Sequence, residues 1–380
     1  MVEFVKLGEV AEIRAGFGFP IKEQGKKIGD YPFYKVADMN HIENSIYMNI
    51  SDNYITCDTA KKLKCNPAPK NTIIFPKVGM TIKTNKKRLL SQISCYDNNI
   101  FGLIADEKYI LSKFLYYLFD QLDLIKFAFG ETAVPSIRKS AIENFEIPIP
   151  PLELQEEIVN CLDVFTNLIS NLEKIITLRK KQYAYYLDEF IKIETSDIVK
   201  LKDVAIYRKE RLKREFLTED NYISVENLLK DRAGKIKSSN LPSVDSVIKY
   251  EKEDILIGNI RPYLKKIWFS DCIGGTNGDV LAIAVINKEK ICPKYLYYIL
   301  SSDTFFSYDV QYSQGGKMPR GRKDMILDFE FPLPTLDTQK EIVHYLDQFT
   351  TLISLLEKKL ELTKKQYAYY RDELLRFERK

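Results

Sequence analysis

Two stretches of the chain place apolar residues at alternating spacings of four and three, the seam pattern of a coiled coil. The first seam is formed by Ile158, Leu162, Phe165, Ile169, Leu172, Ile176, Tyr183, Tyr186 and Phe190. The second seam is formed by Ile342, Leu346, Phe349, Ile353, Leu356, Leu360, Tyr367, Tyr370 and Leu374. We therefore predict two long helices that pair with each other as an antiparallel coiled coil.

These helices belong to an internal repeat. Residues 148–190 return as residues 332–374 at a constant offset of 184 positions, and 27 of the 43 aligned pairs are identical. Prolines at 148, 150 and 151, and again at 332 and 334, exclude helix immediately upstream. The repeat predicts four parts: a first domain at residues 1–147, a central helix at 148–195, a second domain at 196–331 and a distal helix at 332–380.

The segments outside the helices show short β-type runs broken by turn residues, at residues 72–76, 93–105, 254–260 and 279–286. Both segments open with a similar phrase, VKLGEVAEI from Val5 and VKLKDVAIY from Val199, after which their middles diverge. The expected fold class is α+β, with two α/β domains whose sheets are curved and mostly antiparallel. Two halves that agree at their edges and differ in their middles favour recognition over catalysis.

Composition limits the class of protein further. The 380 residues are 45% hydrophobic, without a run of 18 apolar residues, so we expect a cytoplasmic protein with no membrane span. The six cysteines form no CxxC pair, and the two histidines lack partners at ligand spacing, so reduced thiols and no metal site are expected. A net charge of +4 permits a nucleic-acid partner without requiring one.

Basic and polar residues cluster beside turns in both halves. Lysine and arginine neutralise phosphates, whereas arginine and asparagine can contact base edges. A solvated charged loop is the alternative for any one of these residues, and their presence in both halves favours the DNA-binding interpretation. The candidates are Lys83, Lys86, Lys87, Arg88, Arg138, Lys139, Asn259, Arg261, Lys265, Lys266, Lys317, Arg320 and Arg322.

The most faithful block of the repeat is KKQYAYY, at residues 180–186 and 364–370. One interpretation is a helix end with its aromatic core. The other is a surface on which a partner protein docks, since tyrosine is enriched at interface cores. The candidate docking residues are Lys180, Lys181, Tyr183, Tyr186, Lys364, Lys365, Tyr367 and Tyr370.

Sequence motifs for catalysis are missing. The chain contains no GxxxxGK[ST], no GxSxG and no complete GxGxxG. A nucleotide or S-adenosylmethionine site within this chain is therefore not expected, and we predict a non-catalytic protein whose partner carries the chemistry.

With this order of parts, the chain resembles the specificity subunits of type I restriction-modification systems over essentially its whole length. The resemblance rests on two variable domains that end in NFEIPIPPLELQEEIV and DFEFPLPTLDTQKEIV, each followed by a long helix. It implies that each domain reads one half of a bipartite double-stranded DNA target, with the helices setting the gap. It also implies two modification (methyltransferase) subunits as partners that supply S-adenosylmethionine, with restriction subunits as possible additional partners.

Two alternatives remain open from the residues alone. A stand-alone DNA-modifying enzyme would need the cofactor motifs that the sequence lacks. A scaffold protein would use the duplicated helices and the α/β domains to bind other proteins, and DNA retention that depends on both variable domains would argue against it.

Overall fold

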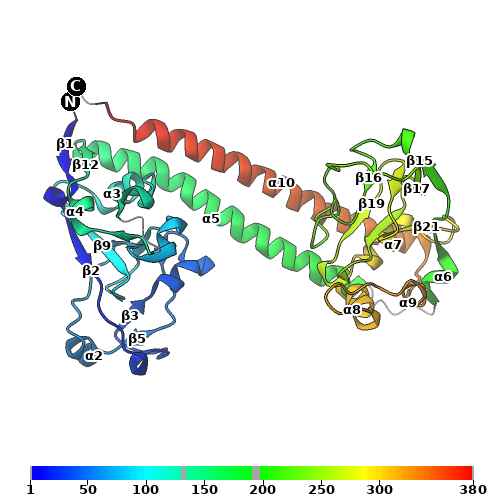
Figure 1. Ribbon diagram of the computed structural model, residues 1–380, viewed down its shortest axis with the longest axis horizontal. Coiled ribbons are helices and arrows are strands. Elements are labelled where there is room, and N and C mark those ends of the chain that lie inside the picture. The colour runs from blue at the N-terminus through cyan, green and yellow to red at the C-terminus, as the bar shows by residue number, and fades with distance from the viewer. Residues whose placement is uncertain (1, 130–133, 191–196, 379–380) are drawn as a thin grey trace. The chain divides into compact units, whose positions relative to one another are not determined.

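The computed structural model describes residues 2–129, 134–190 and 197–378, which form two compact units. The first unit comprises residues 1–170 and 361–380, and the second comprises residues 171–360. Helices α5 (Leu152–Glu189) and α10 (Leu336–Leu374) contribute to both units (Figure 1). Among the described residues, no helix combines the length and the apolar character that crossing a membrane requires.

The first unit is built on a five-stranded sheet in the order β2-β9-β6-β7-β4. Its strands are β2 (Ala11–Ala15), β9 (Ile100–Ala105), β6 (Ile73–Pro76), β7 (Arg88–Leu90) and β4 (Tyr47–Met48). A smaller sheet contains β5 (Tyr54–Ile55), β3 (Tyr31–Tyr34) and β8 (Cys95–Tyr96). The short pairs are β1 (Glu3–Lys6) with β12 (Glu146–Ile149), and β10 (Ala128–Phe129) with β11 (Ser136–Ile137). The helices are α1 (Leu7–Val10), α2 (Cys57–Lys62), α3 (Ser112–Asp120) and α4 (Lys139–Glu143).

The second unit repeats this plan. Its main sheet runs β14-β21-β18-β19, with strands β14 (Ala205–Tyr207), β21 (Val280–Val285), β18 (Ile255–Gly258) and β19 (Ile267–Phe269). The smaller sheet contains β15 (Arg211–Lys213), β17 (Ser246–Tyr250), β20 (Gly274–Thr276) and β16 (Tyr222–Ile223), and β13 (Ile198–Lys200) pairs with β22 (Glu330–Pro332). The helices are α6 (Leu201–Val204), α7 (Pro293–Leu300), α8 (Asp303–Tyr312) and α9 (Lys323–Leu327).

The predicted α+β class with mostly antiparallel sheets is confirmed. The strand pairs in the described residues are antiparallel except β3–β8, β4–β7 and β16–β20. The central strands β6, β9, β18 and β21 are apolar nearly throughout, because helices or the second sheet cover both of their faces. Each predicted β-type run contains one of these strands.

A buried glutamine fixes each long helix to its domain. The Gln155 amide donates to the carbonyl oxygens of Pro150 (2.8 Å) and Tyr109 (2.9 Å), and its Oε1 accepts from the Leu111 N–H (2.8 Å). Gln339 makes the equivalent bonds to Pro334, Lys290 and Cys292 in the second unit. Both side chains are fully buried. They satisfy backbone groups that the proline junction would otherwise leave unpaired.

A second repeated contact lies two turns further along each helix. Asp163 accepts hydrogen bonds from the Tyr117 hydroxyl (2.6 Å) and the Lys113 ammonium of α3. Asp347 accepts from Tyr298 and Lys294 of α7 in the same way. The coiled-coil helices are thus joined to each domain by the same polar groups as well as by the apolar core.

The two long helices run antiparallel, as predicted. In the first unit, the rings of Phe165 and Tyr370 stack with centroids 5.3 Å apart. In the second unit, the ring of Tyr186 lies 5.5 Å from that of Phe349, and Lys180 forms a 2.6 Å ion pair with Glu357. Within the second unit, rising numbers in α5 therefore meet falling numbers in α10.

Candidate nucleic-acid interface

The two predicted basic clusters occupy the same place in the repeated fold. Each follows a central strand and forms a 3₁₀ turn, η4 (Gly79–Thr84) between β6 and β7, and η8 (Pro262–Leu264) between β18 and β19. Both turns end on a residue with left-handed backbone, Asn85 (φ 52°) and Lys265 (φ 49°). This equivalence is absent from the sequence repeat because the two segments share little sequence.

Backbone hydrogen bonds join each turn to a segment about 60 positions further along. In the first unit, the Gly79 N–H donates to Pro135 O (2.7 Å) and the Ile137 N–H donates to Lys77 O (2.8 Å). In the second unit, the Arg261 N–H donates to Pro319 O (2.7 Å) and the Gly321 N–H donates to Asn259 O (3.1 Å). The candidates in these distant segments are thereby brought onto one surface in each unit.

In the first unit, Lys83, Arg138 and Lys139 are exposed, and Lys86 is half-buried. The Arg138 guanidinium lies 3.5 Å from the centre of the exposed Phe129 ring, and Lys139 is 3.3 Å from Glu143. Lys86 bonds to the side-chain oxygen of Asn40. Exposed cations beside an aromatic ring are suited to contact the phosphate backbone or the bases of DNA.

Lys87 lies in the interior, which revises its assignment as a DNA contact. Its ammonium donates to Asn85 Oδ1 (2.9 Å), to Asp120 O (3.2 Å) and to Leu122 O. Burial lowers the pKa of Lys87 to about 8. The lysine therefore holds the turn against α3 from inside. Its neighbour Arg88 is half-buried and donates to Lys87 O (2.8 Å), and burial also lowers the pKa of Arg88.

In the second unit, Arg320 and Lys317 are exposed, and Arg320 lies 3.2 Å from Asp279. Arg261 is half-buried and adopts φ 54° directly before Pro262. A non-glycine residue in this region is strained, and such strain concentrates at functional sites. Lys265 shares this backbone (φ 49°) but is paired with Asp303, so Arg261 is the candidate that this structure singles out most clearly.

The other second-unit candidates have protein partners. Lys265 lies 2.5 Å from Asp303, Arg322 pairs with Asp324, and Lys266 donates to Val225 O. Asn259 is buried, so we assign it to the support of the turn and not to the surface. Sequence reasoning treated all four as equivalent surface residues because residue type does not reveal burial.

A polar cavity of about 500 Å³ adjoins the second turn. Its lining includes a first group, Arg261, Lys266 and Met318, and a second group, residues 224–227 and 238–242. The second group includes Asn227 and Asn240 and was missed by the sequence analysis, because an ordinary polar loop carries no distinguishing pattern. The cavity places amide and hydroxyl groups beside Arg261.

The candidate docking residues divide into two sets. Tyr183 and Tyr367 are half-buried and pack against the two domain cores, as expected for a helix end. Tyr186 and Tyr370 remain exposed, as do all four lysines. Each of these two tyrosines adjoins a second exposed tyrosine, Tyr185 or Tyr369, with ring centres 5.4 Å apart.

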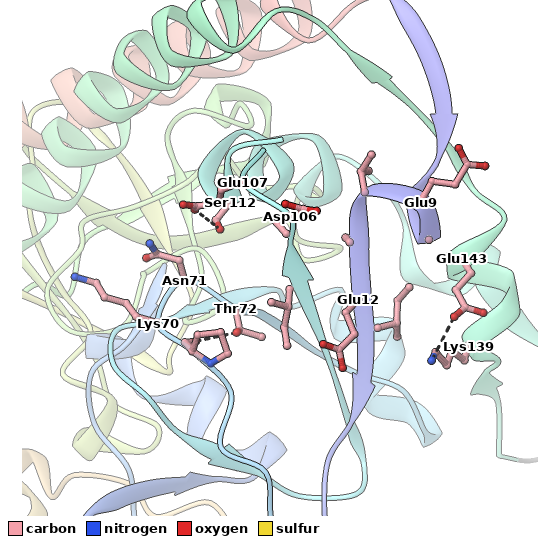
Figure 2. A pocket seen from close by; sticks show the side chains of 17 residues that line it. Glu9, Glu12, Lys70, Asn71, Thr72, Asp106, Glu107, Ser112, Lys139 and Glu143 are labelled. Atoms are coloured by element: carbon pink, nitrogen blue, oxygen red, sulfur yellow. Dashed lines mark hydrogen bonds and ion pairs between the residues drawn. The ribbon is translucent and has the colours of Figure 1, made fainter. Parts of the chain in front are cut away.

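A second hollow, of about 800 Å³, lies on the first unit beside β2 (Figure 2). The carboxylates of Glu9, Glu12, Asp106, Glu107 and Glu143 surround it, with Lys70 and Lys139 as its cations. An excess of carboxylates repels phosphate, so this hollow does not extend the candidate DNA surface.

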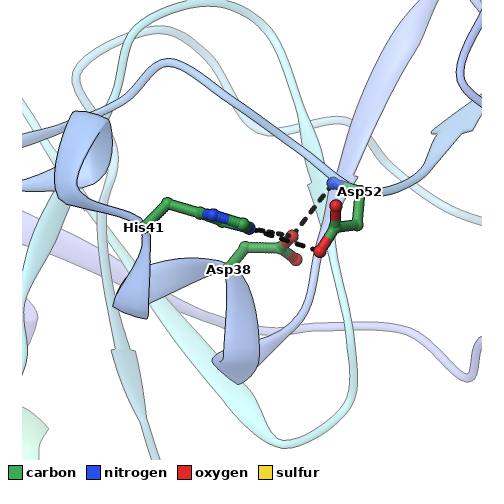
Figure 3. Close-up of side chains that lie close together, drawn as sticks. All are labelled: Asp38, His41 and Asp52. Atoms are coloured by element: carbon green, nitrogen blue, oxygen red, sulfur yellow. Dashed lines mark hydrogen bonds and ion pairs between the residues drawn. The ribbon is translucent and has the colours of Figure 1, made fainter. Parts of the chain in front are cut away.

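Asp38, His41 and Asp52 place their ligand atoms within 4.8 Å of one another (Figure 3). The Asp38 carboxylate already accepts from the backbone N–H groups of Lys35 (2.6 Å) and Asp52 (3.0 Å). Asp52 pairs with Lys27 (3.1 Å) and His41 (3.2 Å), which together lower the pKa of Asp52. These hydrogen bonds and ion pairs explain why the three side chains lie together: they hold the loop at residues 38–52 in place.

Comparison with known proteins identifies close matches to this architecture. The family model described as "Type I restriction modification DNA specificity domain" matches residues 1–179 and 192–364. The EcoR124I/EcoR124II specificity subunit of Escherichia coli is 28% identical, over 72% of this chain and 72% of that protein. A Haemophilus influenzae protein provisionally named a type I restriction enzyme specificity subunit is 26% identical, over 99% of this chain and 96% of that protein.

The fold also matches a solved structure. The S subunit of a type I restriction-modification system from M. genitalium has a TM-score of 0.62 and 16% sequence identity, covering 100% of this chain and 97% of that one. At this identity the likeness concerns the fold.

Proposed function

Because this chain belongs to the type I restriction-modification DNA specificity family, we propose that it is the subunit that selects the DNA sequence for such a system. Each α/β domain reads one half of a bipartite double-stranded target. The observation that carries this assignment is a repeated pair of turns, η4 and η8, which we call the reading turns. Backbone hydrogen bonds join each reading turn in the same way to a second basic segment. The two turns differ in sequence, so the two half-sites are expected to differ as well.

The geometry of the turns supports a division of labour among the candidates. Arg320 and Lys317 in the second unit, and Lys83, Arg138 and Lys139 in the first, are exposed, and the half-buried Arg261 lines the cavity of the second unit. Arginine can make bidentate contacts to guanine, and lysine neutralises phosphates. Lys87 and Asn259 support these residues from the interior.

The coiled coil supplies the spacing between half-sites. Gln155 and Gln339 fix the long helices to their domains, so the length of the helices would set the separation of the two turns. Recognition modules that read a duplex in this way leave an unread gap whose length follows their separation.

The partners follow from this function. Two methyltransferase subunits would bind the chain, hold S-adenosylmethionine and methylate adenines that they extract from the duplex. Restriction subunits would join this assembly. The exposed pairs Tyr185–Tyr186 and Tyr369–Tyr370 offer one aromatic surface on each unit to such partners, and the chain itself would carry no catalytic step.

The test is the adenine methylome of a cell that expresses this chain together with its methyltransferase subunit, compared with the methyltransferase alone. We expect one bipartite motif with two dissimilar halves, present only when this chain is present. A stable complex without any chain-dependent motif would instead support the protein scaffold.

A further inference from the structure

A buried polar cluster lies beneath the reading turn of the second unit. Asp309, on α8, is 1% exposed, and Asn259, at the end of β18, is 5% exposed. Among residues 2–129, 134–190 and 197–378, no donor reaches either carboxylate oxygen of Asp309 or the side-chain oxygen of Asn259. A protein interior rarely leaves three such acceptors without a hydrogen bond.

Gly321 shows how closely these groups meet. A Cβ atom at this position would lie 2.3 Å from Asp309 Oδ1 and 2.8 Å from Asn259 Oδ1, so any other residue would displace these side chains. The Gly321 N–H also donates to the backbone oxygen of Asn259. Three segments that are distant in sequence therefore converge on this point.

One hydrogen bond between the side chains of Asp309 and Asn259 would give these buried oxygens a partner. A protonated Asp309 carboxyl can donate to Asn259 Oδ1, and an Asn259 amide rotated by half a turn can donate to the carboxylate. Either bond removes the cost of facing unpaired acceptors in the interior. In either case the hydrogen bond holds the Asn259 side chain against α8.

We propose that Asp309 and Asn259 form one buried hydrogen-bonded pair that sets the positions of Arg261 and Arg320, and thereby the base preference of the second domain. This inference rests on the proposed function. Asn259 is two residues from Arg261, and its backbone oxygen is bound by Gly321, the neighbour of Arg320. A shift of the pair would therefore move both arginines.

Among the described residues of the first unit, no asparagine occupies the position of Asn259. The backbone bridge from Val78 to Ser136 corresponds to the bridge from Ile260 to Arg320, so the place of Asn259 is taken by Lys77. The Lys77 ammonium lies 4.6 Å from the centre of the Phe101 ring. Consequently, any effect of the pair should be confined to the second half-site, and the first half-site serves as an internal control.

The experiment uses the full chain with its methyltransferase subunit and compares Asp309→Leu with Asp309→Asn. Asp309→Leu removes the pair and leaves the buried side-chain oxygen of Asn259 without a partner, so the melting temperature should fall, and selectivity is measured on the variant below that temperature. Discrimination between cognate and singly altered DNA should fall about tenfold or more at the second half-site and stay unchanged at the first. Asp309→Asn keeps the volume and the hydrogen bond and should restore selectivity.

Gly321→Ala provides a second route, because its methyl group would force the two side chains apart while keeping both. It should relax the second half-site as Asp309→Leu does, and it decides the matter if the leucine variant does not fold. Unchanged selectivity in a folded variant would overturn the inference, as would equal loss at both half-sites. A wild-type chain that directs no motif at all would instead refute the proposed function.

Discussion

At the scale of single residues, Arg261 combines a charge with an unfavourable backbone. Arg261 has a φ of 54° and directly precedes Pro262. Backbone strain of this kind costs about 1–3 kcal/mol. A strained conformation is kept only when the surrounding contacts hold it in place. Here the Arg261 N–H bond to Pro319 and the packing of η8 against α8 provide those contacts. The arginine is therefore placed at the price of some stability.

The pair Arg261→Ala and Arg261→Gly separates these two properties. Both variants remove the guanidinium, so both should weaken binding to DNA that carries an intact second half-site. The base preference at the first half-site should stay unchanged. Glycine adopts this backbone freely, so Arg261→Gly should be more stable than Arg261→Ala by about 1 kcal/mol. Thermal unfolding and titration with half-site variants measure the two effects. Equal losses at both half-sites would make Arg261 a general phosphate contact or a folding residue.

Asp309 gives a pH-dependent prediction. Burial raises its pKa from the ordinary 3.8 to about 7. The titratable group that faces it is Tyr207 of β14, whose pKa is raised by burial and by the charge of Asp309. On the elements packed against α8, Lys265 is paired with Asp303, Arg322 with Asp324 and Lys294 with Asp347, and the other cations there are Arg261 and Lys323.

The folded chain binds this proton more tightly than the unfolded chain does. The Asp309 contribution to stability is therefore complete below about pH 4, falls as the pH rises to about 7, and is level above that. The free energy of unfolding of wild type, minus that of Asp309→Asn, should decrease across this window by a few kcal/mol. Denaturant titrations at pH 5 and pH 8 measure it. A difference independent of pH would indicate that Asn259 donates to an ionised Asp309.

At the scale of elements, the junction glutamines make each long helix a continuation of its domain. Gln155→Leu would leave three buried backbone groups without partners, which we expect to cost about 2–4 kcal/mol. The Leu111 amide should then exchange faster in hydrogen-exchange experiments, while the Cys292 amide, bound by Gln339, should be unaffected. Gln339→Leu should show the reverse. The exposed neighbour Glu156 supplies the control, since Glu156→Gln should change neither amide.

The seam of the coiled coil contains one polar residue in each helix. Thr363 is 4% exposed and so lies within the seam, whereas Arg179 is half-buried and donates to Gln182 on its own helix (2.8 Å). The same heptad position is thus filled in two different ways. The arginine keeps its charge at the helix surface while its stem covers apolar neighbours.

At the scale of the whole molecule, the repeat makes helix length a determinant of the target. Inserting seven residues after Ser170 in α5 and seven after Leu360 in α10 preserves the heptad seam, because seven residues turn each helix almost a whole number of times. The insertion adds about 10 Å, so the gap between half-sites should grow by about three base pairs.

The methylome of the doubly extended chain measures this gap. Both half-sites should stay as they are in wild type, because neither reading turn changes. An insertion in α5 alone provides the comparison, since it places the two seams out of register and should weaken the assembly. An altered half-site with a constant gap would contradict the ruler function.

The sequence by itself determined the repeat, the two long helices and the class of fold. These follow from local patterns: heptad spacing, proline junctions and short β-type runs between turn residues involve near neighbours, so they can be recognised without knowing the chain path. The family resemblance rests on the same motifs, at residues 144–159 and 328–343, and membership of that family is confirmed.

Only the tertiary structure decided which candidate residues reach the surface. Lys87 and Lys83 are four positions apart in one basic cluster, yet one is buried beneath α3 and the other is exposed. The pairing of Arg261 with the segment around Arg320, and the meeting of Asp309, Asn259 and Gly321, depend on contacts across about 50 or 60 residues. Burial and long-range pairing arise from how the elements pack, and the residue pattern of a single loop does not encode them.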